Sequence, residues 1–218
     1  MTWEAMWPLL WQATLETLGM VLPSALIAQV VGTALGTVLT LTRPGGLRPQ
    51  AATYRVLDVL VNVGRSLPFI ILLVLLIPLT RLITGTSIGS VAATVPLTIA
   101  AIPFVARLVD GALRDVPGGV IEAARVVGAT TAQTVFKVLL PEARPALIHG
   151  FTVMLISLIG YSAMAGAIGG GGLGDLAIRY GYQRFETGVM VATVVALLVL
   201  VQGVQWVGDR AATRADHR

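Results

Sequence analysis

The chain has no cysteine, a single lysine (Lys137) and only two histidines among its 218 residues. Without cysteine, neither a disulfide nor a thiolate metal site can form. His149 and His217 lie far apart in the chain, and no Ser, His and Asp set or pair of carboxylates can be assembled within its apolar segments. The sequence therefore predicts a protein that is not an enzyme and holds no cofactor or metal of its own.

Charge is also scarce. Only 12% of the residues are charged and 56% are hydrophobic, with a mean hydropathy of +0.84, whereas soluble domains contain about 25% charged residues. This composition predicts an all-α, polytopic membrane protein surrounded by lipid. The net charge is +4, but in a membrane chain the placement of cations matters more than their sum, so nucleic-acid binding is not implied.

No Lys or Arg precedes Arg43. A secretory signal peptide has a positive region before its apolar core, so we expect the first apolar segment to be retained. Ahead of that segment, Trp3, Trp7 and Trp11 recur every four residues on one helical face. We expect residues 1–13 to lie along the membrane interface, where tryptophan gathers.

Five apolar segments are long enough to cross a bilayer, and no linker divides them, so residues 1–218 are expected to form one transmembrane domain. The segments cover about residues 14–42, 56–82, 88–109, 145–167 and 188–207. Gly32 and Gly36 in the first form a small-xxx-small pair, which allows close helix contact.

Five spans would distribute the cations unevenly between the two sides of the membrane. One side carries Arg43, Arg48, Arg55, Arg107, Arg114, Arg125, Lys137, Arg144, Arg210, Arg214 and Arg218. The other side carries Arg81, Arg179 and Arg184. The positive-inside rule then places the 115–141 loop and the C-terminus in the cytoplasm and the N-terminus outside.

The 115–141 loop is the longest polar interruption of the chain, and its turn residues predict two short helices. Pro117 suits a first helical turn, and Gly128 suits a helix end that needs positive φ. Thr130 and Gln133 have the spacing of a capping box, and Pro141 is expected to end the second helix at the preceding residue. Each helix would be roughly 15 Å long, half of a ~30 Å hydrocarbon core, so both must lie at the membrane surface.

Apolar residues are expected to form one buried face on each of these two helices. They are Val120, Ile121, Ala124 and Val127 in the first helix and Val135, Phe136, Leu139 and Leu140 in the second. Such a pair either tethers two membrane helices or presents its other face to a partner.

Arg65 lies inside the second predicted span. At that position it either faces a watery interior or extends to the headgroups at the cytoplasmic end. Pro68 and Pro78 in the same span, and Pro96 and Pro103 in the third, each remove a helical hydrogen bond, so kinks are expected.

A run of glycines occupies most of residues 166–174. No Gly-Lys-Ser/Thr follows it, and Lys137 is the only lysine, so the run is not a Walker-type phosphate-binding loop and the chain cannot itself be the ATPase. We expect the glycines to break the fourth span on the outer side and to allow close packing there.

Residues 122–141 resemble the EAA signature of importer-type ABC transporter permeases. The residues that carry the resemblance, at the spacing of the signature, are Glu122, Ala123, Ala124, Gly128, Leu140 and Pro141. This resemblance implies a type I importer permease whose loop forms coupling helices that dock into a separate ATP-hydrolysing subunit, which binds the ATP. Glu122 is then expected to hold the helix through charged contacts, and Gly128 to permit the turn.

Other segments look like the methionine importer permeases, the MetI-like proteins, over residues 14–209. They are NVGRSLPFIILL (62–73), GTSIG (85–89), VPLTIAAIPFVAR (95–107), GYSAMAGAIGGGGLG (160–174) and AIRYGY (177–182). The resemblance implies a symmetric homodimer in the bacterial cytoplasmic (inner) membrane, with two cytoplasmic ATP-binding subunits. It also implies an external substrate-binding lipoprotein that delivers methionine, often including the D-enantiomer.

Three alternatives stay open. Related glycine-betaine and sulfonate permeases share the glycine run, so another small solute is the first. A secondary transporter or channel is the second, although inverted repeats or ionisable relays at the membrane midplane would then be expected, and neither is evident. A membrane-anchored scaffold is the third, although it would need no kinked, glycine-rich spans.

A translocation path is expected at the axis of the homodimer, because one five-span protomer offers little room for an amino acid. Its candidate residues are Arg65, Ser66, Phe69, Tyr161, Ser162 and Met164. Hydroxyl and charged groups suit a zwitterionic head group, and Phe69 and Met164 suit a thioether. The alternatives are that Tyr161 and Met164 are ordinary helix packing and that Arg65 organises a cytoplasmic gate.

Overall fold

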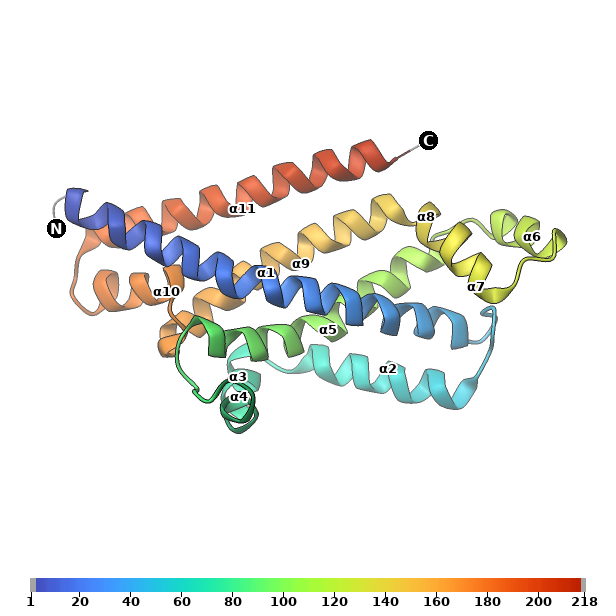
Figure 1. Ribbon diagram of the computed structural model, residues 1–218, viewed down its shortest axis with the longest axis horizontal. Coiled ribbons are helices and arrows are strands. Elements are labelled where there is room, and N and C mark those ends of the chain that lie inside the picture. Colours follow the sequence, from blue (N-terminus) through green and yellow to red (C-terminus); the bar gives the residue numbers. More distant parts are fainter. Residues whose placement is uncertain (1–2, 217–218) are drawn as a thin grey trace.

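Four long helices run along the length of the molecule (Figure 1). The computed structural model describes residues 3–216, and no strand occurs among them. The long helices are α1 (Trp3–Thr42), α5 (Ser90–Arg114), α9 (Arg144–Ala165) and α11 (Thr187–Ala215). All four are long and apolar enough to cross a membrane, and the pair α2 (Ala51–Ser66) and α3 (Phe69–Leu75) qualifies as a fifth, broken span. The protein is therefore an all-α polytopic membrane protein, as its composition predicts.

The first helix is longer than predicted. Residues 3–13 form its opening turns and continue directly into the segment predicted as the first span. The prediction of a separate interfacial anchor over residues 1–13 is wrong for the part that is described. At 1.5 Å per residue, 40 residues extend about 60 Å. Trp7 and Trp11 are each 57% exposed on this helix.

The second predicted span, residues 56–82, is not one kinked helix. It is divided into α2, α3 and α4 (Ile77–Thr84), and the axes of α2 and α3 differ by 103°. Leu67 between them is extended, with φ −78° and ψ 126°. The physical reason is Pro68, which donates no backbone hydrogen bond and disfavours helical geometry in the residue before it. In contrast, Pro96 and Pro103 both lie inside the uninterrupted α5.

The core forms where α1 crosses α5. A Cβ atom on Gly32 would lie 2.5 Å from Val105 Cβ, and one on Gly36 would lie 2.5 Å from the Ala106 carbonyl oxygen. The close contact predicted for this glycine pair is therefore confirmed, and α5 is its partner. Among the largest fully buried side chains of this core are Met20 of α1, Leu97 and Leu113 of α5, and Met154 and Leu158 of α9.

The glycine run ends α9 as predicted and turns the chain into α10 (Gly172–Leu176). Gly169, Gly171 and Gly172 have φ of 93°, 74° and 76°, values that only glycine adopts freely. The backbone N–H groups of Gly172 and Leu173 donate to the side chains of Glu16 and Thr17, at 2.8 and 2.9 Å. Residues of α1 thus cap the start of α10.

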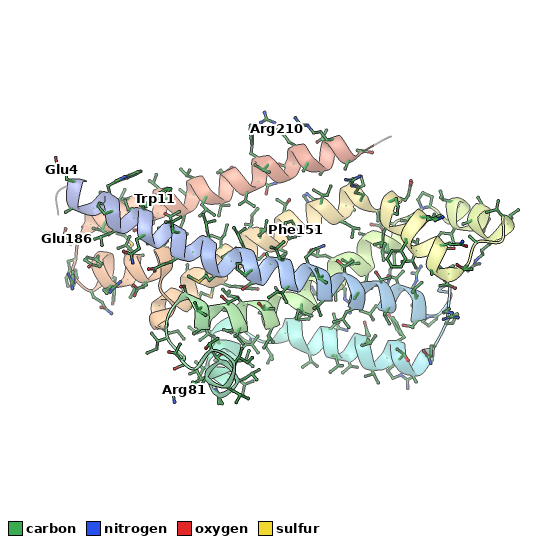
Figure 2. All side chains as sticks on the ribbon, in the orientation of Figure 1. Glu4, Trp11, Arg81, Phe151, Glu186 and Arg210 are labelled. Atoms are coloured by element: carbon green, nitrogen blue, oxygen red, sulfur yellow. The ribbon has the colours of Figure 1, made fainter. Side chains whose placement is uncertain are left out.

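Different helices and chain termini lie at the two ends of the molecule. The N-terminus and α10 lie at one end, and the C-terminus lies towards the other, where α6 (Gly118–Val126), α7 (Thr131–Thr134) and α8 (Leu140–Glu142) are found (Figure 1). In Figure 2 the labelled acidic side chains Glu4 and Glu186 lie at the first end, and the basic side chain of Arg210 lies further along α11 towards the second.

Candidate functional site: the coupling segment and the surfaces around it

Gly128 forms the turn between the two short helices. Its φ is +75°, and its N–H donates to the Arg125 carbonyl at 3.0 Å. The next N–H, that of Ala129, donates to the Ala124 carbonyl at 3.0 Å. These two bonds make a Schellman motif, which ends a helix with a left-handed residue. The prediction of positive φ at this glycine is confirmed.

The second helix starts with the capping box that the sequence predicts. Thr130 Oγ1 accepts a bond from the Gln133 N–H at 3.3 Å, and Gln133 Oε1 accepts one from the Thr130 N–H at 2.8 Å. This reciprocal pair is the predicted capping box.

The end of that helix differs from the prediction. Helical geometry continues through a π-helical segment (Val135–Leu139) and α8, beyond Pro141, and only Ala143 separates it from α9. A widened π turn is one way in which a helix accommodates a local disruption such as the missing N–H of proline. Pro117, in turn, precedes the first helix as its N-cap and does not lie within it.

One face of the coupling segment, residues 115–141, is anchored in the core. Ala124, Val135 and Leu139 are buried, while Ile121 and Leu140 are partly buried and pack beside them. These five residues were predicted to face inward, and they do.

Three other residues were wrongly predicted to be buried. Val120, in the first turn of α6, is 38% exposed. Val127 is 81% exposed and Phe136 is 71% exposed. Val127 is the C-cap that leads into the glycine turn, and Phe136 lies on the π-helical segment, so regular helical periodicity does not place either side chain. Together with Glu122, Ala123 and Val126, which are also exposed, they form what we call the tip surface. Exposed apolar side chains of this size mark a surface for a partner.

Two of the six candidate path residues come together in the structure. The rings of Phe69 in α3 and Tyr161 in α9 stack with centroids 4.7 Å apart and planes 6° from parallel. Met164 is 47% exposed on α9, and Arg65 and Ser66 are exposed at the end of α2. Ser162 differs from these residues. It is 2% exposed, and its hydroxyl donates to the Ile159 carbonyl at 2.7 Å, so it faces the core of the protomer.

The sequence reasoning missed a set of charged residues where α1, α2 and α5 meet. Asp110 is 1% exposed and forms ion pairs with Arg107 and Arg114, and Arg107 also pairs with Asp58 on α2. A usable signal was present. Asp58 lies within the predicted 56–82 span and Asp110 directly after the 88–109 span, and carboxylates at membrane depth are rare and functional.

Comparison with known proteins agrees with this geometry. Residues 32–216 match the model of the family described as binding-protein-dependent transport system inner membrane component. A relative from Vibrio cholerae, named a probable D-methionine transport system permease protein MetI, is 51% identical over 96% of this chain and 93% of its own. The D-methionine transport system permease protein MetI of Escherichia coli K12 is 51% identical over 73% of this chain and 75% of its own.

Solved structures give the same result. The permease chain in a structure titled as inward-facing conformations of the MetNI methionine ABC transporter is 48% identical, with both chains fully covered and a TM-score of 0.97. An amino acid ABC transporter, 21% identical, matches in fold with a TM-score of 0.73 over 95% of this chain and 94% of its own. The family match and these identities show that the chain belongs to the inner membrane components of binding-protein-dependent transport systems.

Proposed function

We propose that two copies of this chain form the membrane path of an ATP-driven methionine importer in the bacterial inner membrane. The observation that carries the proposal is the tip surface, an exposed apolar patch held by a glycine turn whose residues fit the EAA signature. A lone protein gains nothing from exposing Val126, Val127 and Phe136, at 87%, 81% and 71%, to water. An ATP-hydrolysing subunit that covers them accounts for their exposure.

The way in which the segment is built suits mechanical coupling. It follows α5 directly, its first helix α6 begins after three residues, and α8 leads into α9 through Ala143. Its inner face is part of the main core. A partner that moves the tip surface therefore moves the cytoplasmic ends of α5 and α9 with it, because packed cores transmit displacement. In this proposal Glu122 and Ala123 contact the ATPase, Gly128 sets the turn, and Ala124, Leu140 and Pro141 join the segment to the membrane helices.

The path itself is proposed to lie between two protomers, beside the break from α2 to α3. Arg65, Ser66 and Met164 are exposed near it, and the Phe69–Tyr161 stack forms its wall. Ser162 supports this wall from inside the protomer, since it is buried. A cationic group and hydroxyls suit the head group of methionine, and aromatic and thioether side chains suit its sulfur.

The orientation and the remaining partners complete the proposal. We place the tip surface and the C-terminus in the cytoplasm and the N-terminus outside, where an external binding lipoprotein would deliver the substrate. The excess of cations at the end that carries the tip surface supports this orientation. Because the closely matching structure is titled inward-facing, we also assign the arrangement of this chain to the inward-facing state.

Competition between substrates tests the methionine assignment. The chain is reconstituted in lipid vesicles with its ATPase and binding protein, and ATP-dependent uptake of labelled L-methionine is measured with a hundredfold excess of unlabelled L-methionine, D-methionine, glycine betaine or a sulfonate. We expect the methionine enantiomers to reduce uptake and the other two solutes to leave it unchanged. No ATP-dependent uptake of labelled methionine, together with uptake of labelled glycine betaine or a labelled sulfonate by the same vesicles, would instead support the alternative substrate class.

A further inference from the structure

Asp110 is the most deeply buried charged group on α5. Its side chain is 1% exposed, and both of its oxygens are occupied. Oδ1 accepts from Thr40 Oγ1 at 2.9 Å and from Arg114 Nε at 3.1 Å, while Oδ2 accepts from Arg107 at 3.3 Å and pairs with Arg114 at 2.8 Å. A buried carboxylate persists only when it is paired and hydrogen-bonded, and these four contacts meet that requirement.

Arg107 connects this buried carboxylate to a different helix. One of its terminal nitrogens reaches Asp110, and the other donates to Asp58 Oδ1 at 2.7 Å and to Asn62 Oδ1 at 2.8 Å, both on α2. Asn62 in turn donates to Asp58 Oδ2 at 3.1 Å. The planar guanidinium fork thus spans two helices, which the single ammonium group of lysine cannot do with the same geometry.

The two halves of this network differ in their access to water. Asp110 is enclosed, whereas the side chains of Arg107 and Asp58 are 24% and 30% exposed. Spacings of three and four residues place Arg55, Asp58, Asn62 and Arg65 along one side of α2. A polar stripe on a membrane helix indicates a water-lined surface. The contact between α5 and α2 is therefore made at the edge of such a surface, where water can compete for it.

We infer that Arg107, held in place by Asp110, is a positioning residue that keeps α2 beside α5 in the inward-facing state, and that its contact with Asp58 and Asn62 is released when the transporter turns outward. This inference rests on the proposed function. α2 carries the broken end of the second span, so its placement relative to α5 sets the geometry of the path. In this inference the buried contacts of Asp110 with Arg107 and Arg114 stay in place, and the partly exposed contacts of Arg107 with Asp58 and Asn62 open.

The variant that isolates the releasable contact is Asp58→Asn. It keeps the size of the side chain and an oxygen for Arg107, but it removes the charge attraction. Close packing of α2 on α5, where a Cβ on Gly64 would meet Pro103 Cγ at 2.9 Å, is untouched, so the chain is expected to fold and assemble. Weakening a contact made in one state shifts the population towards the other. We expect the number of ATP molecules hydrolysed per methionine imported to rise roughly two- to fivefold, the factor that corresponds to the loss of a partly exposed ion pair.

The measured quantity is the number of ATP molecules hydrolysed per methionine imported by the reconstituted complex. A merely structural role would lower the amount of complex and leave this ratio unchanged. Asp209→Asn is the matched control, because Asp209 also accepts from an amide side chain, that of Gln205 at 2.8 Å, on the exposed face of α11. Arg107→Lys tests whether the planar guanidinium group is needed to reach both helices. The double variant with Asp58→Asn is expected to raise the ratio no further than the larger single change, since both changes remove the same contact.

The inference is supported if Asp58→Asn and Arg107→Lys raise the ratio and Asp209→Asn does not. It is overturned if the ratio stays at the wild-type value in both test variants, or if the control raises it equally. Failure of the wild-type complex to import methionine with ATP would count against the proposed function instead, so the two failures are distinguishable.

Discussion

The carboxylate of Glu16 in α1 accepts a 2.8 Å hydrogen bond from the backbone N–H of Gly172, 156 positions further along the chain. Gly171 and Gly172 both have positive φ, and a Cβ on Gly171 would lie 2.9 Å from Glu16 Oε2. The glycines therefore allow the loop to approach α1 closely enough for a side chain to cap α10.

Loss of this cap should loosen the glycine loop locally. Glu16→Ala removes a hydrogen bond to a charged acceptor, worth about 1.5–3 kcal/mol, so amide exchange in residues 170–174 should accelerate about tenfold or more. Hydrogen-exchange mass spectrometry measures this directly. Glu4→Ala, which removes an exposed carboxylate near the start of the same helix, serves as the control and should leave the exchange unchanged. Equal exchange in both variants would show that the cap contributes nothing.

Substitutions at Gly128 test the effect of backbone strain alone, without a change in packing. No atom lies within 4 Å of the Cβ position, so a side chain there meets open space and only the φ of +75° opposes it. Gly128→Val should therefore abolish uptake and co-purification of the ATPase while the chain still inserts, because β-branched residues avoid this region. Gly128→Asn should retain most of both activities, since Asn tolerates left-handed geometry. Equal losses in Val and Asn variants would contradict the role of the backbone.

A charge placed on the tip surface should weaken binding of the ATPase subunit without lowering the stability of the chain. Phe136 is 71% exposed, so Phe136→Asp removes little buried area from the chain but places a charge where an apolar partner is expected. Affinity for the ATPase subunit should fall at least tenfold, with an unchanged melting temperature. Phe185→Asp changes another highly exposed phenylalanine (85%), next to Glu186, which lies at the opposite end of the molecule (Figure 2), and should leave that affinity unaltered. A matching loss for both variants would remove the assignment of the tip surface.

Topology can be tested with single cysteines, since the natural chain has none. Thr86 and Gln133 are both exposed, before α5 and in α7 respectively. In intact cells a membrane-impermeant thiol reagent should label Thr86→Cys, and it should label Gln133→Cys only after the membrane is opened. Labelling of both from the same side would refute the proposed orientation.

Local features were predictable from the sequence because their causes are local. The capping box at Thr130 and Gln133 needs only the spacing of two side chains, and the left-handed turn at Gly128 needs only the absence of a Cβ. The Gly32 and Gly36 pair announced a close helix contact in the same way, although it did not name α5 as the partner. The EAA residues were identified because they keep the residue types and the spacing of the family signature.

The features that were missed depend on tertiary structure. Proline rules predicted a disturbance at Pro68, but they gave neither the size of the 103° bend nor the packing of Phe69 and Leu73 of α3 in the main core. The exposure of Phe136 follows from a π-helical segment, which shifts side-chain directions away from the regular period of 3.6 residues. Asp58 and Arg107 are 49 positions apart, and no periodicity within either helix predicts their contact.

The most direct test of the central claim is the time course of labelled methionine entering vesicles that hold the complex, with the binding protein on the outside and the ATPase face supplied with ATP on the inside. The account predicts accumulation above the external concentration that requires ATP, and it predicts that Gly128→Val and Phe136→Asp each abolish this accumulation. Entry that only equilibrates the two sides, or that proceeds equally without ATP or with both variants, would contradict it.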